Sequence, residues 1–185
     1  ISFKDRQPVL KKIWQAARWT LIISLIAVVL SFGLAIPLGV WSASREGSRF
    51  DHGMGLFLFM LYSLPAFWVA TLLIIFLTTP EYGRWLDWFP TAGLGGMDAG
   101  DSFWERVLDF AWHITLPVFC LTYGSLAIIA RQMRGSMLDV LGKPLVLTAR
   151  AKGAGEPRVI WRHAFRNALF PIITLIGSVV PALLS

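Results

Sequence analysis

The residue types that most often carry chemistry in proteins are few in this sequence. There is one cysteine, Cys120, and there are three histidines, His52, His113 and His163, none with a second ligand at metal-site spacing. The phosphate-binding pattern G-x-x-x-x-G-K-[ST], the nucleophile pattern G-x-S-x-G and the zinc pattern H-E-x-x-H are all missing from the sequence. We therefore expect a chain that is not an enzyme and that binds neither a metal nor a cofactor.

The composition is that of a membrane protein. Of the 185 residues, 56% are hydrophobic and 15% are charged, whereas a soluble domain carries about 25% charged residues. Four stretches contain no Asp, Glu, Lys or Arg, and each is close to the roughly 20 residues that a helix needs to cross a bilayer. They predict four spans in a transmembrane domain over 19–185, at about 19–42, 54–80, 111–131 and 167–185.

The first residue is Ile1 and the chain ends inside an apolar stretch. We therefore expect a fragment of a longer membrane protein, with one or more further spans at each end.

Basic residues are unevenly distributed between the connections. The segment 131–166 holds eight Lys or Arg and two acids, whereas 81–109 holds two Lys or Arg and six acids. The positive-inside rule therefore predicts a cytoplasmic loop over 132–166 and an external loop over 81–110. By alternation the basic segment 1–18 is external, lying on lipid headgroups. Since topology explains the formal net charge of +6, we expect no nucleic-acid partner.

Two further patterns concern the spans and the external loop. Small residues recur every fourth position in the first span, which favours close packing against another helix: Ala27, Ser31, Ala35 and Gly39. Four glycines predict a flexible middle of the external loop: Gly93, Gly95, Gly96 and Gly100. The apolar spacing over 103–112 then predicts a short interfacial helix before the third span.

The basic loop contains the signals of a short helix between two breaks. Gly142 ends the preceding helix, and Pro144 begins a new one of about two turns. Gly153 and Gly155 end it, and Pro157 begins the next helix. The small and apolar residues of this helix suit docking in a groove of another protein. An ordinary hairpin with a solvated basic face explains the same pattern.

A resemblance decides between these interpretations. The segments Thr148-Ala-Arg-Ala-Lys-Gly153 and Arg162-His-Ala-Phe-Arg-Asn-Ala-Leu-Phe-Pro171 resemble the cytoplasmic loop of ABC importer permeases of the dipeptide/oligopeptide type. The wider family pattern is Glu-Ala-Ala, three residues, then Gly. Leu147, Thr148 and Ala149 stand in the Glu-Ala-Ala places, so Leu147 departs from the acidic residue. The segment 36–39 is similar to these permeases too. Three other segments resemble the microcin/peptide importer branch: 45–51, 88–90 and 112–117.

The resemblance implies an all-α, multi-span permease fragment with an external interfacial helix and a cytoplasmic coupling helix. That helix would sit in a cleft of a separate ATPase, which binds ATP and magnesium. Arg150 and Lys152 would pair with acids on the ATPase or contact lipid headgroups. The implied coupling residues are Leu145, Leu147, Thr148, Ala149, Arg150, Ala151, Lys152, Gly153, Ala154 and Gly155.

The same resemblance implies the other partners and the location. A second permease subunit would form a heterodimer with this one, and a periplasmic binding protein would deliver peptides or similar small solutes. The protein would be a multi-pass protein of the bacterial inner membrane. Candidates for the substrate path, with lipid-facing or packing roles as the alternative, are Tyr62, Ser63, Tyr123 and Ser125. An ion-coupled carrier or channel and a non-transport membrane scaffold remain the alternative functions.

Overall fold

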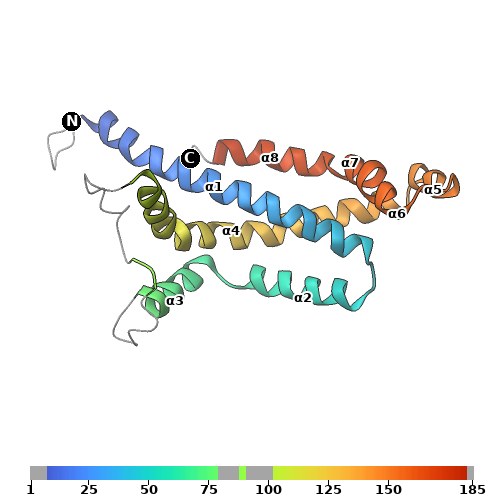
Figure 1. Cartoon of the computed structure of the whole chain (residues 1–185), viewed down its shortest axis with the longest axis horizontal. Helices are drawn as coiled ribbons and strands as arrows, with labels where there is room; N and C mark the ends of the chain where they lie inside the picture. The colour runs from blue at the N-terminus through green and yellow to red at the C-terminus, as the bar shows by residue number, and fades with distance from the viewer. Residues whose placement is uncertain (1–7, 79–87, 91–101, 183–185) are drawn as a thin grey trace. The chain divides into compact units, whose positions relative to one another are not determined.

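The computed structural model describes residues 8–78, 88–90 and 102–182 (Figure 1). The described residues form helices and no strands, which confirms the all-α expectation. The larger helices are α1 (Val9–Ser44), α2 (Arg49–Ser63), α3 (Ala66–Thr78), α4 (Phe103–Leu141), α5 (Pro144–Ala151) and α8 (Phe170–Ala182). Between α5 and α8 lie the short helices α6 (Glu156–Arg158) and α7 (Phe165–Ala168), joined by the π-helical segment η2 (Val159–Ala164).

Length and apolar composition identify two or three candidate membrane spans. In α1 the segment Ala17–Ser44 qualifies, and so does α4. Helices α2 and α3 qualify only when they are counted together as one interrupted span. In the described part of the chain α8 has 13 residues, fewer than the roughly 20 that cross a bilayer.

The span expected over 54–80 is interrupted at Leu64 and Pro65, between α2 and α3. Proline lacks a backbone N–H and moves the residue before it away from the helical region. The Pro65 carbonyl instead accepts bonds from the N–H groups of Trp68 and Val69, at 3.0 and 3.1 Å, where α3 begins. The absence of charge predicted a span over these residues, and α2 and α3 together still qualify as one interrupted span.

Two further expectations concern the segments before the first and third spans. The segment from Val9 onward is the first part of α1, and its external location on lipid headgroups stays a prediction. Likewise the interfacial helix expected over 103–112 continues without a break into α4, which has 39 residues and contains Pro117. Neither glycine nor proline occurs from Phe103 to Leu116, so nothing local ends the helix there. The four loop glycines at 93–100 lie outside the described residues.

The chain divides into two compact units, and both α1 and α4 contribute to each of them. The first unit comprises residues 1–27 and 64–121. In its described part Ala27 packs with Ile114 and Val118, and the rings of Trp19 and Phe110 lie 5.8 Å apart.

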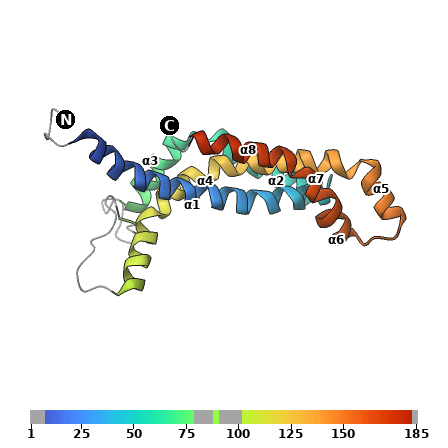
Figure 2. The same ribbon diagram turned by 90° about the horizontal axis from the view of Figure 1, so that it is seen from above.

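The second unit comprises residues 28–63 and 122–185 and contains the larger core. Its core draws Val40 from α1, Met133 and Met137 from α4 and Ile172 from α8. The later part of α1 therefore lies beside α4 and α8, as both ribbon views show (Figure 1, Figure 2).

The small residues of α1 are buried, as their spacing predicts. Ala27 belongs to the first unit, and Ser31, Ala35 and Gly39 belong to the second. The Ser31 hydroxyl donates to the Thr122 carbonyl at 3.3 Å. A Cβ atom on Gly39 would lie only 2.6 Å from the Ala130 carbonyl oxygen. The partner of this face is therefore α4, and only glycine permits so close an approach at position 39.

Candidate functional site

The breaks expected on either side of α5 are present. Lys143 adopts an extended conformation, and Pro144 occupies the start of the helix, where its missing N–H removes no helical bond. At the other end Gly153 has φ +78°, a left-handed conformation that favours glycine. The Gly153 N–H donates to the Arg150 carbonyl at 2.9 Å, and the Ala154 N–H donates to the Ala149 carbonyl at 3.1 Å. These bonds close the last turn of α5.

The two faces of α5 have different environments. Val146 is fully buried in the core of the second unit, and Ala149, one turn later, packs against the same core. On the opposite face Leu147 is 52% exposed, and Thr148 and Ala151 are exposed too. Leu145, on the flank, is 54% exposed. The structure thus has a short helix held by its own core, with Leu147 exposed on its free side; docking of that side on another protein stays a prediction.

Arg150 has a partner within the same loop. Its Nε donates to Glu156 Oε1 at 2.8 Å and its Nη2 to Oε2 at 3.1 Å, which makes a two-bond contact between the guanidinium and the carboxylate. Both side chains remain substantially exposed. The pair ties α5 to the start of α6, and the expected pairing of Arg150 with an ATPase or a headgroup stays a prediction. Lys152 is exposed.

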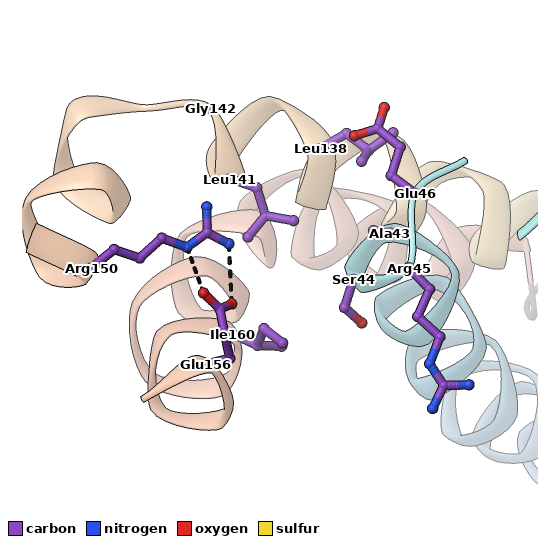
Figure 3. Close-up of a pocket in the computed structure, with 10 residues that line it drawn as sticks. All are labelled: Ala43, Ser44, Arg45, Glu46, Leu138, Leu141, Gly142, Arg150, Glu156 and Ile160. Atoms are coloured by element: carbon purple, nitrogen blue, oxygen red, sulfur yellow. Dashed lines mark hydrogen bonds and ion pairs between the residues drawn. The ribbon is translucent and has the colours of Figure 1, made fainter. Parts of the chain in front are cut away.

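A cavity of about 420 Å³ lies beside this ion pair (Figure 3). Figure 3 shows Arg150 and Glu156 on one side and the turn after α1, with Arg45 and Glu46, on the other. Leu141 and Ile160 provide apolar lining between them. The cavity therefore adjoins three parts of the second unit: the turn after α1, the end of α4 and the α5–α6 segment.

An ion pair with one buried partner, which the sequence did not reveal, lies in the second unit. Asp51, in the first turn of α2, is 6% exposed, whereas the Arg134 side chain is 32% exposed. Arg134 of α4 donates to it through Nε and Nη2, each at 2.7 Å. The Ser42 hydroxyl also donates to Oδ1, and the Gly47 N–H donates to Oδ2 at 3.1 Å. Both carboxylate oxygens are thus saturated by donors from α1, the turn after it and α4.

Part of this arrangement had a signal in the sequence. The spacing Ser48-Arg-Phe-Asp51 is typical of a helix start, and the Asp51 N–H does donate to the Ser48 hydroxyl at 3.2 Å. The partner could not be read in this way, because Arg134 lies 83 positions away in the sequence.

The substrate-path candidates have different surroundings. Tyr62 is 61% exposed, and the Arg131 guanidinium lies 6.0 Å from its ring. Both residues line a cavity of about 380 Å³ together with Gln132 and Asp139. Tyr123, in contrast, is buried. Ser63 and Ser125 are exposed. The role of all four residues in a substrate path stays a prediction.

The described remainder of the expected external loop belongs to the first unit. The rings of Phe89 and Trp112 stack at 4.5 Å. His113 Nδ1 lies 2.8 Å from the Asp109 carbonyl and 3.3 Å from Asp109 Oδ1, contacts within one helical turn. Within the described chain, no group of three His, Cys, Asp or Glu side chains is arranged to hold a metal ion.

These helices define the chain as part of a helical membrane protein. The family described as "Binding-protein-dependent transport system inner membrane component" matches residues 35–185, and this chain belongs to that family. The match includes α5 and the Asp51–Arg134 pair.

Three curated relatives indicate the branch of the family. The oligopeptide transport system permease protein AppB of Bacillus subtilis (strain 168) is 37% identical over 88% of this chain and 49% of its own length. The dipeptide transport system permease protein DppB of Escherichia coli (strain K12) is 38% identical over 100% of this chain and 58% of its own. The inner membrane ABC transporter permease protein YejB of Escherichia coli O157:H7 is 38% identical over 82% and 41%. The chain thus spans about half the length of these relatives.

Proposed function

We propose that this chain forms part of the transmembrane subunit of an ATP-driven importer in a bacterial inner membrane. The importer moves peptides or similar small solutes that a periplasmic binding protein delivers. ATP binds and is hydrolysed on a separate cytoplasmic subunit, and a second permease subunit completes the path as a heterodimer. The family and the relatives named as dipeptide and oligopeptide permeases support this proposal.

The single observation that carries the coupling role is the two-sided character of α5. Val146 holds the helix to the core of the second unit, while Leu147 and Ala151 face outward. A partner that grips the outward face displaces the helix, and the buried face transmits this displacement to α4 and α1. This is how closure of an ATPase dimer would open one side of the path and close the other.

Replacement of Gly153 tests the proposal. Gly153→Trp places a side chain where φ is +78° and where nothing lies within 4 Å of a Cβ atom. The last turn of α5 then reorganises without a clash inside the core. We expect normal membrane insertion and a loss of substrate-stimulated ATP hydrolysis in the complex with the ATPase and the binding protein.

The matched control is Gly53→Trp in α2, where the site is exposed and equally open but φ is not left-handed. The Gly53→Trp variant should retain substrate-stimulated ATP hydrolysis. Stimulation that survives Gly153→Trp would contradict the coupling role. Transport that needs no ATP would favour an ion-coupled carrier, and no substrate-dependent hydrolysis even in the unaltered complex would favour a scaffold.

A further inference from the structure

We propose that the Asp51–Arg134 ion pair is a positioning lock, which makes the turn after α1, the start of α2 and the α5-bearing end of α4 move as one body. The inference rests on the proposed function, since it concerns how motion of α5 reaches the spans. It assigns a role to two residues outside α5 and outside the substrate-path candidates.

The geometry of the Asp51–Arg134 pair constrains the relative orientation of the two side chains as well as the distance between them. Two nearly parallel bonds of 2.7 Å join the Arg134 guanidinium to the Asp51 carboxylate. Such a planar contact fixes the relative orientation of the groups that it joins, which a lysine ammonium cannot do. The bonds from Ser42 and from the Gly47 N–H hold the carboxylate from the α1 side. Asp51 therefore connects the start of α2 to α1, to the turn after it and to α4 through polar contacts.

The pair lies close to α5 along a continuous core. Arg134 precedes the end of α4 at Leu141 by seven residues, which is a rise of about 10 Å. Its neighbours Met133 and Met137 are fully buried, and the same core includes Val140 and Val146. One turn before Arg134, the close approach of Gly39 to Ala130 joins α4 to α1. Motion of α5 is thus transmitted to α4 immediately beside the lock.

Stability alone does not account for the geometry of this pair. The Asp51 side chain is 6% exposed, and the cost of removing its charge from water offsets part of the attraction to Arg134. A contact through two bonds also fixes the orientation of α2 relative to α4, and that orientation is what the transmission of motion requires.

The test uses the complete transporter in lipid vesicles, with its ATPase, its binding protein and radiolabelled dialanine as the probe. Peptide uptake and ATP hydrolysis are measured together. Arg134→Lys keeps the positive charge and loses the planar contact, and Asp51→Asn removes the negative charge. We expect each variant to retain peptide-stimulated hydrolysis, while the peptide imported per ATP falls at least about fivefold, the lower end of coupling between distinct sites. Arg49→Gln, an exposed arginine in the same turn of α2, should keep the ratio of the unaltered protein.

A covalent cross-link between positions 51 and 134 tests the same inference if these variants do not assemble into a transporter. In a Cys120→Ala background, Asp51→Cys and Arg134→Cys are joined with a short bifunctional thiol reagent. A lock that stays closed predicts that the cross-linked transporter imports dialanine with at least half of the coupling ratio of the unaltered protein. Import abolished by the cross-link would show that the two positions must separate, and would overturn the inference.

Failure of the inference and failure of the proposed function give different results. An unchanged import-to-ATP ratio in Arg134→Lys, with lower abundance as the only effect, would show a merely structural pair and overturn the lock. No peptide-stimulated hydrolysis in the unaltered complex would overturn the proposed function itself, together with the lock that depends on it.

Discussion

The contact between Arg150 and Glu156 bears directly on how Arg150 is interpreted. A basic residue on a docking helix is a natural candidate for an ion pair across the interface. Here its guanidinium already makes two bonds to Glu156, and both side chains are partly exposed. The pair therefore orients the end of α5 relative to α6.

This assignment predicts that Arg150 and Glu156 act as a unit. Arg150→Gln and Glu156→Gln should weaken ATPase co-purification to a similar, small extent, because an exposed ion pair contributes about 0.2 to 1 kcal/mol. The charge-reversed double variant Arg150→Glu/Glu156→Arg should restore binding. The measurement is ATPase recovered per permease at two salt concentrations.

Lys152→Gln, in the same loop, is the control for a general loss of positive charge. If Arg150→Gln alone abolished co-purification while Glu156→Gln had no effect, Arg150 would pair with the ATPase directly.

At the scale of helices, the small-residue face of α1 packs very closely against α4. A Cβ atom at Gly39 would meet the Ala130 carbonyl oxygen at 2.6 Å and the Met133 Cβ at 2.7 Å. Neither atom is the flexible end of a side chain, so the helices themselves would have to separate.

We therefore expect Gly39→Ala to destabilise the second unit by about 1 to 3 kcal/mol, the usual cost of overpacking. Thermal unfolding of the purified protein in detergent measures this change. Gly33→Ala is the matched control, because Gly33 lies on the same helix, is exposed and has nothing within 4 Å of its Cβ position. The opposite order of stability would show that α1 and α4 do not meet at Gly39.

Local sequence signals predicted some elements well. Gly142, Pro144 and Gly153 mark the ends of α5 through backbone chemistry that acts within a few residues. The four-residue spacing of Ala27, Ser31, Ala35 and Gly39 identified the packing face of α1, although it did not identify α4 as the partner.

The sequence was less informative where a local signal did not decide the helix bounds, and where a contact joins residues that are far apart in the sequence. Absence of charge indicated a span over 54–80 but did not locate the interruption of its helix at Pro65. Apolar spacing indicated a separate helix over 103–112, although no helix-ending residue separates it from α4. The Asp51–Arg134 pair depends on how α1, α2 and α4 pack, and a single sequence holds no local trace of that packing.

At the scale of the whole molecule, the chain combines two units that share α1 and α4. The second unit contains α5, the Asp51–Arg134 pair and the cavity beside Arg150. The features assigned to energy coupling therefore lie in one compact unit. The family match over residues 35–185 covers nearly all of that unit.

The central claim is that the outward face of α5 is gripped by a separate ATPase. Photo-cross-linking tests it most directly, with a photoreactive residue at Leu147 or Ala151, both exposed on that face, and at Thr115, exposed on α4 in the first unit. The full transporter is irradiated in membranes. We predict cross-links to the ATPase from positions 147 and 151 and none from position 115. Positions 147 and 151 that cross-link only to lipid, or to a protein on the periplasmic side, would contradict the account.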